Sequence, residues 1–321
     1  MDVERGDHER PNGAVLSPGE LSARRAATRR RRTRRRGGLL VGLAIVAAVG
    51  VAIGSGASGG RKPAAVPRPP TRVVTRVPSA GLAGSGGSVK RRAAPQASVG
   101  RVLAYTTYVQ LASSRRREVA LTFDDGPSQF TRLILATLVR THTPATFFVI
   151  GRWARAYPQV LAAETSDGLE IGDHTQTHAF LTQLSPARQR DEIEQAAGAI
   201  TGAGAPAPVL FRPPYGAFNA ATLAILRATR LLMVLWSVDT SDYARPGVKR
   251  IVYTAVSGAR PGAIILMHDG GGDRSQTAAA LPQIIKLLRR RGFKLVTISQ
   301  LLADDPPPAN QPPPRPLAGV G

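Results

Sequence analysis

The sequence contains no cysteine. This absence excludes disulfide bonds and thiolate metal sites, so any metal that the chain binds must take nitrogen and oxygen ligands. It does not identify the compartment, because many exported proteins also lack disulfides. Histidine is scarce as well, with five in 321 residues, so two histidines that lie close together in the sequence are candidate ligands.

Acidic residues are few, since 21 Asp and Glu stand against 43 Lys and Arg, which gives a formal net charge of +22. Most of the basic excess falls in residues 1–100, whose sequence is not that of a folded domain. A basic excess is one property of nucleic-acid-binding proteins, but no nucleic-acid motif accompanies it here. Its position favours an orientation signal at a membrane and attraction to anionic envelope polymers, so nucleic acid is not expected as a partner.

One long apolar run, LLVGLAIVAAVGVAIG at Leu39–Gly54, follows a segment with nine arginines between Arg24 and Arg36. With the small residues beside it, the run reaches the roughly 20 residues that a membrane-spanning helix needs. Arginines on its N-terminal side predict an N-terminus inside and the remaining chain outside. We therefore expect an uncleaved single-pass anchor in the cell membrane. A signal peptide cleaved near Ser55–Ala57, which would give a secreted protein, is the alternative, and a twin-arginine export signal is a weaker one.

The segments that flank the central region have compositions typical of unfolded chain. Residues 55–100 are rich in Gly, Pro, Ser, Ala and Arg without sustained periodicity, which predicts an extended linker. The C-terminal DDPPPANQPPPRPLAGVG predicts a disordered tail. The expected organisation is a cytoplasmic Arg-rich segment (1–37), the anchor (38–57), a linker (58–117), one catalytic domain (118–303) and the tail (304–321).

Between linker and tail, apolar strand-like runs alternate with amphipathic helical stretches. The expected strands are Val119–Phe123, Ala145–Ile150, Leu169–Gly172, Val209–Phe211, Leu231–Trp236, Ala263–Met267 and Phe293–Ile298. The expected helices include Pro186–Ile200 capped by Ser185, Ala220–Thr229, and Thr277–Arg291 ended by Gly292. Seven such repeats predict a parallel sheet covered by helices, either open or closed as a barrel. Active sites of such folds are built where the strands end.

Two motifs carry the most specific chemistry. LTFDDGP places Asp124 and Asp125 at a strand end, where neighbouring side chains point in opposite directions, so one acid can bind a metal and the other can act as a base. HTQTH places His174 and His178 at i and i+4, on one side of an expected helical turn, where they can hold one divalent ion. No glutamate follows the first histidine, so this is not the HExxH arrangement and the base must come from elsewhere; Asp124 is available.

Three further motifs follow later strands. FRPPYG carries Arg212, whose guanidinium can fix a carboxylate, and backbone N–H groups that can act as oxyanion donors. WSVDTSDY carries Asp242, and ILMHD ends an apolar strand with His268. A histidine there is a candidate general acid, and a buried carboxylate such as Asp242 would raise its pKa. A single strand-end histidine is more often a structural residue.

Together and in this order, the five motifs resemble those of the polysaccharide deacetylases with a NodB homology domain, carbohydrate esterase family 4, over about residues 118–302. The resemblance implies an α/β fold of the distorted (β/α) barrel type and metal-dependent deacetylation of a polysaccharide. It implies Asp125, His174 and His178 as the metal ligands, with zinc as the usual ion and cobalt or another divalent ion as the alternative.

The resemblance also implies how protons move. Asp124 resembles the catalytic base, and Arg212 resembles the arginine that orients this base. His268 resembles the general acid, and Asp242 resembles the carboxylate that tunes it. All four residues are present, so the catalytic set that the resemblance implies is complete.

The substrate-binding residues implied by the resemblance do not all match the family pattern. The backbone N–H of Tyr215 resembles the oxyanion donor, Leu266 resembles the apolar residue that lines the acetate-methyl pocket, and Trp236 belongs to the same substrate-binding set. Tyr243 stands where the family commonly has Trp, and Asp173 where many members have Asn. The replacement of Trp by Tyr243 leaves the substrate preference open.

Peptidoglycan is the expected substrate, because an anchored enzyme on a linker of this length works where the wall is. Chitin oligosaccharides and acetylxylan remain alternatives, since a family resemblance does not choose among them. A non-catalytic wall carbohydrate-binding protein would keep the fold and lose Asp124 or His268, and neither is lost. The sequence leaves the oligomeric state open, and a monomer is assumed.

Overall fold

The computed structural model describes residues 95–312. The expected cytoplasmic segment and anchor, most of the expected linker, and the end of the tail lie outside these residues. Within the part that is described, no helix combines the length and the apolar composition needed to cross a membrane.

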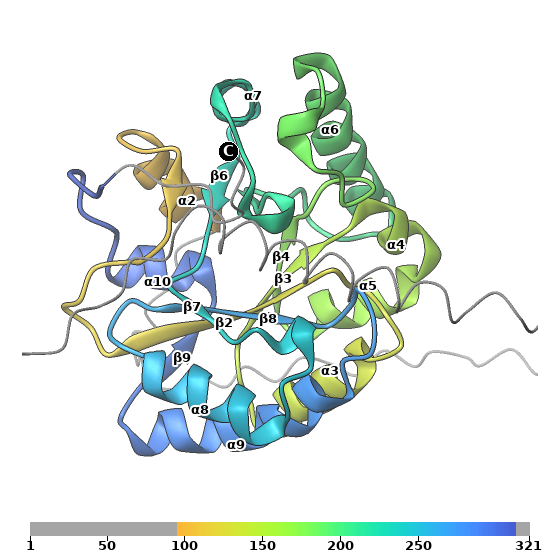
Figure 1. The fold of residues 1–321 in the computed structure, drawn as a ribbon. Coiled ribbons are helices and arrows are strands. Elements are labelled where there is room, and N and C mark those ends of the chain that lie inside the picture. Colours follow the sequence, from red (N-terminus) through yellow and green to blue (C-terminus); the bar gives the residue numbers. More distant parts are fainter. Residues whose placement is uncertain (1–94, 313–321) are drawn as a thin grey trace, which may run out of the picture. The chain divides into compact units, whose positions relative to one another are not determined.

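A nine-stranded sheet lies at the centre of the domain (Figure 1). Its strands are β1 (Tyr108–Val109), β2 (Glu118–Asp124), β3 (Thr146–Val149), β4 (Glu170–Asp173), β5 (Leu210–Phe211), β6 (Leu232–Val234), β7 (Val238–Asp239), β8 (Ile264–His268) and β9 (Lys294–Val296). The spatial order is β1-β6-β5-β4-β3-β2-β8-β7, with β9 also paired to β2, and the strand pairs are parallel. The seven expected strands are all present, so the prediction of a parallel α/β sheet is confirmed.

Helices surround the sheet (Figure 1). They are α2 (Pro95–Leu103), α3 (Thr131–Arg140), α4 (Gly151–Ala156), α5 (Pro158–Ser166), α6 (Pro186–Gly202), α7 (Ala220–Thr229), α8 (Val248–Gly258), α9 (Ser275–Arg290) and α10 (Ile298–Asp304). Short 3-10 turns lie at η1 (Leu181–Gln183), η2 (Pro214–Gly216) and η3 (Asp242–Ala244). The three expected helices are confirmed. The Ser185 side chain caps α6 by accepting the N–H of Arg188, and Gly292 adopts a φ of 76° just beyond α9.

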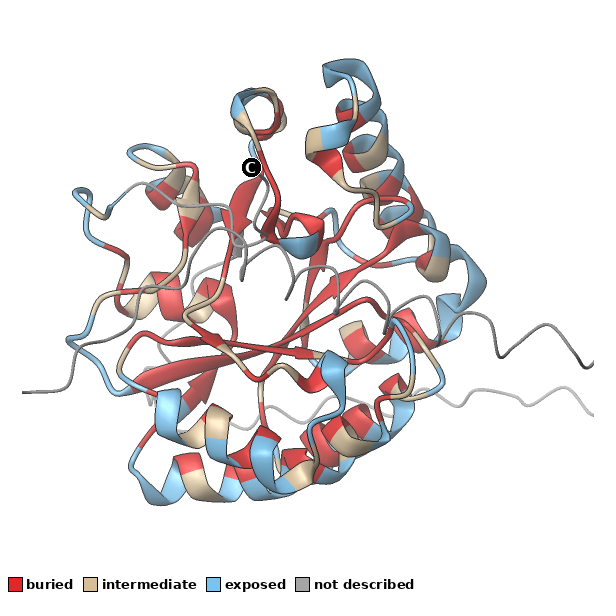
Figure 2. Ribbon diagram, in the orientation of Figure 1, coloured by how far each residue is buried: buried red, intermediate tan, exposed pale blue. Residues whose placement is uncertain are grey.

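Alternate residues of the strands pack into different cores, so the curled sheet has an outer and an inner face. In β8, Ile265 and Met267 pack under the outer helices, whereas Ile264 joins an inner cluster closed by α2 and α10. In β3, Phe147 lies in the outer core and Phe148 in the inner one. Figure 2 shows the resulting buried strands at the centre of the domain. The carboxyl end of the inner face is where polar residues replace apolar ones.

The described domain extends beyond the expected limits of 118 and 303 at both ends. In the expected linker, α2 contributes Val99 and Val102 to the inner core, and β1 pairs with β6. In the expected disordered tail, the Tyr108 hydroxyl donates to the carbonyl of Pro312 at 2.6 Å, and the Gln311 side-chain amide donates to the carbonyl of Tyr108 at 2.9 Å. A two-residue strand and a proline-rich segment have no periodicity, so sequence pattern does not reveal them.

Candidate active site

The polar motif residues gather at the carboxyl edge of the sheet. Asp124 is the last residue of β2 and lies in register with His268, the last residue of β8. His174 directly follows β4, and Arg212 directly follows β5. Because parallel strands end at the same edge, segments that are far apart in the sequence meet there.

Asp125, His174 and His178 form a cluster whose possible ligand atoms all lie within 4.8 Å of one another. Asp125 Oδ1 is 3.1 Å from His178 Nε2 and 3.5 Å from His174 Nε2, yet this buried oxygen has no hydrogen-bond partner within the described residues. Burial alone would raise the pKa of Asp125, but the two imidazoles that face it lower this pKa well below its usual range.

The tautomer of His174 shows what the cluster can hold. His174 Nδ1 lies 2.7 Å from the carbonyl oxygen of Arg212. A carbonyl only accepts, so Nδ1 carries a proton, and Nε2 is the nitrogen that faces Asp125. When Nε2 carries no proton, one carboxylate oxygen and two imidazole nitrogens form a donor set for a divalent cation. The residues therefore fit a metal ion.

The two histidines lie on a loop and not on the helical turn that their spacing suggested. Thr175 and His178 adopt positive φ angles of 66° and 65°. Asp173 Oδ1 accepts the backbone N–H of Thr175 at 2.8 Å, and Thr175 Oγ1 accepts the N–H of His178 at 3.0 Å. These two bonds fold the loop so that both Nε2 atoms face Asp125. Burial raises the pKa of Asp173 well above its usual value, although the bond from Thr175 opposes this.

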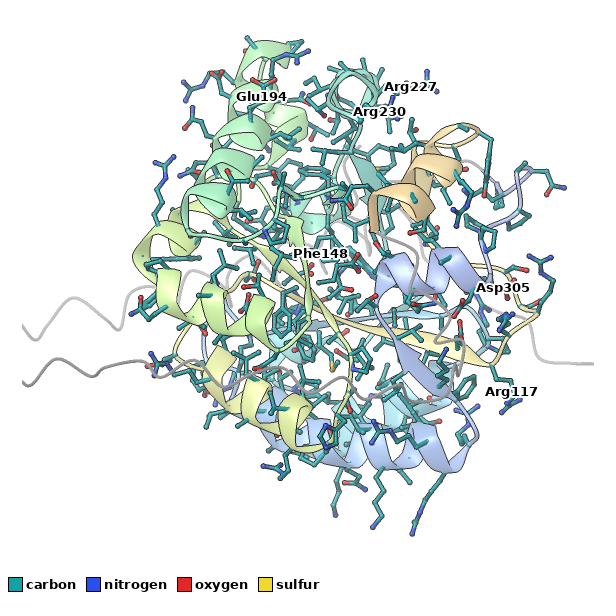
Figure 3. The ribbon with its side chains drawn as sticks, turned by 180° about the vertical axis from the view of Figure 1, so that it is seen from behind. Arg117, Phe148, Glu194, Arg227, Arg230 and Asp305 are labelled. Atoms are coloured by element: carbon teal, nitrogen blue, oxygen red, sulfur yellow. The ribbon has the colours of Figure 1, made fainter. Side chains whose placement is uncertain are left out.

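The neighbouring acid, Asp124, points to a different partner. Its Oδ1 accepts from Arg212 Nη1 at 2.7 Å, while its Oδ2 lies 3.8 Å from His174 Nε2. Arg212 is fully buried, donates also to the Thr122 hydroxyl at 2.8 Å, and lies 4.0 Å from the ring centre of Phe148, which is labelled in Figure 3. The guanidinium thus fixes one carboxylate oxygen and leaves the other facing the cluster.

His268 and Asp242 form a second polar pair beside the cluster. His268 Nδ1 lies 2.7 Å from Asp242 Oδ1, and Asp242 Oδ2 accepts both the backbone N–H of His268 at 2.8 Å and the Thr277 hydroxyl at 2.7 Å. Burial would lower the pKa of His268, but Asp242, with smaller contributions from Asp124 and Asp125, raises it to about 9. The protonated ring can therefore bind Asp242 through Nδ1 and keep a proton on Nε2 to donate.

Tyr215 contacts the cluster through its side chain, a contact that the sequence did not indicate. Its hydroxyl lies 3.2 Å from His178 Nδ1, and its ring stacks on Phe180 with ring centres 5.2 Å apart. Tyr215 has a φ of 61°, in the turn that follows β5. This contact orients the His178 ring, as the Arg212 carbonyl orients His174.

The other expected substrate-binding residues surround His268 and Arg212. Leu266 precedes His268 by two residues on β8, so both side chains lie on the same face of the strand, and Leu266 is buried. The half-exposed Tyr243 ring meets the His268 ring edge-on at 5.4 Å. Trp236 lies with its ring centre 5.6 Å from the Arg212 guanidinium. Thr277, which helps to hold Asp242, was not found from the sequence because it lies on α9, outside the motifs.

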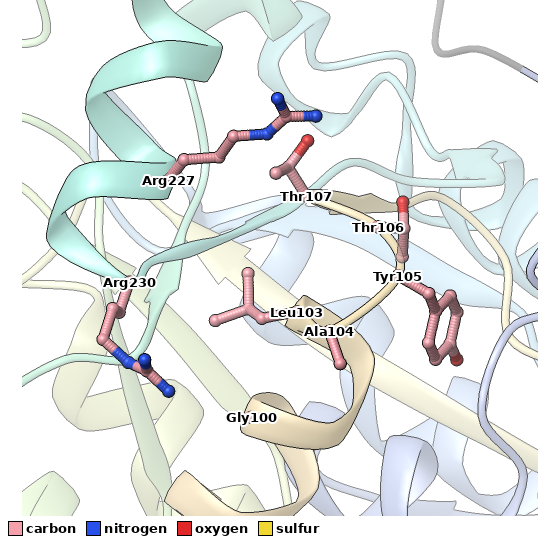
Figure 4. Close-up of a pocket in the computed structure, with 8 residues that line it drawn as sticks. All are labelled: Gly100, Leu103, Ala104, Tyr105, Thr106, Thr107, Arg227 and Arg230. Atoms are coloured by element: carbon pink, nitrogen blue, oxygen red, sulfur yellow. The ribbon is translucent and has the colours of Figure 1, made fainter.

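Two cavities differ in their relation to these residues. A cavity of about 430 Å³ is lined in part by Asp125 and His178 and so opens directly beside the cluster. Another, of about 540 Å³, lies between α2 and α7 and is lined by Arg227 and Arg230 (Figures 3 and 4). None of the residues that line the second cavity belongs to the metal-binding cluster or to the polar pairs beside it.

Comparison with known proteins places the chain in a family. Residues 112–234 match the polysaccharide deacetylase family. A chitooligosaccharide deacetylase from Bradyrhizobium sp. is 41% identical over 217 residues, which cover 61% of this chain and 99% of that protein. A peptidoglycan-N-acetylglucosamine deacetylase from Bacillus cereus is 38% identical over 187 residues, covering 57% and 87%.

Solved structures give the same result. A family 4 carbohydrate esterase from Streptomyces lividans, in complex with acetate, matches with a TM-score of 0.55 and 36% identity over 59% of this chain and 95% of that one. The fold expected from the motifs is therefore shown as a curled, parallel α/β half-barrel. The chain belongs to the polysaccharide deacetylase family, carbohydrate esterase family 4, and is a hydrolase that deacetylates polysaccharide.

Proposed function

We propose that the enzyme removes the N-acetyl group from N-acetylglucosamine in peptidoglycan. The Bacillus cereus relative is named for this substrate and the Bradyrhizobium relative for chitooligosaccharides, so the two names share an acetylated amino sugar. The expected anchor and linker favour the wall polymer, because they would hold the domain next to it. Chitin oligosaccharides and acetylxylan are the second candidates.

The cluster of Asp125, His174 and His178 is the observation that carries the proposal. An unpaired buried oxygen that faces two imidazoles fits one divalent cation, and we propose zinc, with cobalt or another divalent ion as the alternative. When bound, this ion supplies a water of lowered pKa and polarises the acetyl carbonyl. Three protein ligands leave positions open for both groups, as a catalytic site requires.

The residues beside the cluster fit the two proton transfers of amide hydrolysis. Asp124 Oδ2 faces the cluster and accepts the proton of the attacking water, while Arg212 holds the carboxylate in place. His268 donates a proton to the departing sugar amine, and Asp242 keeps its ring protonated and oriented. In the overall reaction the water oxygen becomes part of acetate, and the sugar amine gains a proton.

The remaining roles concern binding of the acetyl group and the sugar. The backbone N–H of Tyr215 is proposed as a donor to the developing oxyanion. Leu266 is proposed to contact the acetyl methyl, since it lies buried on the same strand face as His268. Trp236 and Tyr243, which flank Arg212 and His268, are proposed to line the sugar groove.

Acetate release by the full-length protein tests the proposed function. We expect release from peptidoglycan, loss of release after chelation, and recovery when a divalent ion is added back. Asp124→Asn should be inactive, because an amide does not accept the water proton. Release from chitin oligomers or acetylxylan but not from peptidoglycan would favour the second candidates, and full activity of Asp124→Asn would contradict the proposed role of this residue.

We also propose that residues 38–57 anchor the enzyme in the cell membrane with the catalytic domain outside. The apolar run and the preceding arginines support this topology. Protease added to intact cells should remove the domain, and the protein should stay in the membrane fraction after a high-salt wash. Recovery of the protein in the culture medium would instead support cleavage and secretion.

A further inference from the structure

The cavity beside the metal-binding cluster has a second wall that the five motifs do not include. Besides Asp125 and His178, its lining includes Arg152, Trp153 and Tyr157, which come from α4 and the residue that ends it. The cavity is thus continuous from the proposed reaction centre to a cationic and aromatic surface. A polysaccharide has sugars on either side of the one that reacts, so this wall is placed to meet a neighbouring unit.

Backbone hydrogen bonds join this wall to the loop that carries the histidines. The N–H of Gly151 donates to the carbonyl of Thr175, and the N–H of Arg152 donates to the carbonyl of Gln176, both at 3.0 Å. Gly151 allows this close approach, because a Cβ there would lie 2.3 Å from the Gln176 side chain. Arg152 therefore has a fixed backbone position relative to His174 and His178.

The Arg152 side chain lies against an aromatic ring but forms no ion pair among the described residues. Its guanidinium carbon lies 4.6 Å from the centre of the Trp153 ring. The ion pairs among the described residues do not include Arg152, and the side chain is exposed at the cavity. A guanidinium lying against an indole keeps its N–H edges free, and this planar fork matches a carboxylate.

We propose that Arg152 binds a carboxylate carried by the sugar unit next to the one that is deacetylated, with Trp153 as the residue that positions it. This inference rests on the proposed function and extends it to specificity. The ligand chemistry is a carboxylate on a glycan of acetylated amino sugars, supplied either by the lactyl group of the alternate sugar or by the peptide attached to it. Chitin has no such charge, so the residue would distinguish an anionic wall glycan from a neutral one.

Kinetics of Arg152→Gln in the full-length, metal-loaded enzyme test the proposal on three substrates: peptide-bearing glycan, glycan stripped of peptide, and chitin oligomers. We expect kcat/KM on anionic glycan to fall roughly tenfold or more, mainly through KM, with chitin changed less than about twofold. The lactyl carboxyl is an amide wherever the peptide is attached, so a loss on the stripped glycan alone assigns the lactyl carboxylate. A loss on the peptide-bearing glycan alone assigns the peptide, and a loss on both shows that Arg152 binds either carboxylate. Arg152→Lys should be intermediate, because it keeps the charge and loses the fork.

Arg155→Gln is the matched control, because Arg155 lies exposed on the same helix and is not part of the cavity lining. Binding of the same glycans to Asp124→Asn, with and without Arg152→Gln, gives a second readout that does not depend on turnover. Equal effects of Arg152→Gln on anionic and neutral glycans, or no effect on either, would overturn the proposal. A wild-type enzyme that releases no acetate from any glycan would instead overturn the proposed function.

Discussion

At the scale of single residues, each of the three carboxylates in the site contacts a different partner. Asp124 is bound by a buried guanidinium, Asp125 faces two imidazoles, and Asp242 holds His268. All three are aspartates, so the role of each one is assigned from the group that contacts it. The roles proposed above can be tested one residue at a time for this reason.

Asp242→Asn should shift the alkaline limit of activity to lower pH. His268 must be protonated to donate, so activity is present below its pKa and is lost as the pH rises through it. Asp242 contributes most to raising that pKa to about 9, and without its charge the pKa should return toward the ordinary value of about 6.5. The pH profile of kcat/KM should then lose its alkaline limb about 1–2 units earlier.

Thr277→Val is the matched control for this prediction, because it removes one hydrogen bond to Asp242 and leaves the charge in place. Its alkaline limb should shift much less than that of Asp242→Asn. An unchanged profile in Asp242→Asn would show that the alkaline limb does not report on His268.

Asp173 supports a second prediction at this scale. Its Oδ1 accepts the Thr175 N–H that folds the histidine loop, while its Oδ2 is buried without a hydrogen-bond partner among the described residues. Asp173→Asn keeps the acceptor, so activity and melting temperature should be close to those of the wild type. Asp173→Ala leaves the N–H unsatisfied, which should cost about 1–3 kcal/mol and reduce metal affinity. Similar behaviour of the two variants in thermal unfolding would contradict this account.

At the scale of elements, α2 and β1 belong to the domain although they precede the first family motif. Val99, Val102 and Val109 are buried in the inner core beneath the site. Their loss would expose the interior of the curled sheet to water. The helices outside the sheet do not cover this inner face.

Two chains that are truncated at the N-terminus test the role of α2 and β1. A chain that begins at residue 95 should keep most of the melting temperature of the domain, whereas one that begins at residue 118 should aggregate or unfold at much lower temperature. Each buried valine that is lost contributes about 1.5–3 kcal/mol, which is large against the usual stability of a domain. Equal thermal unfolding of the two chains would show that α2 and β1 are dispensable.

At the scale of the whole molecule, the sequence predicts what is periodic or chemically specific. Largely apolar runs such as Val119–Phe123 indicate the central strands, because parallel strands that are buried on both faces are mostly hydrophobic. The histidine pair stood out because histidine is scarce in this chain. The order of the five motifs along the chain indicates the family.

What the sequence did not predict depends on contacts between distant segments. The two-residue strands β1 and β7 lack periodicity, and the contact of the Tyr215 hydroxyl with His178 joins residues 37 positions apart. The i, i+4 spacing of His174 and His178 predicts a helical turn, but bonds to the side chains of Asp173 and Thr175 fold this segment as a loop. Tertiary contacts supplied these features, and no local pattern encodes them.

The most direct test of the account compares metal content and acetate release in two adjacent variants of the full-length protein. We predict that the wild type retains one divalent cation per chain after dialysis, that Asp125→Asn loses the cation and the activity, and that Asp124→Asn keeps the cation but loses the activity. Retention of the cation by Asp125→Asn, or loss of the cation in Asp124→Asn, would contradict the assignment of the cluster.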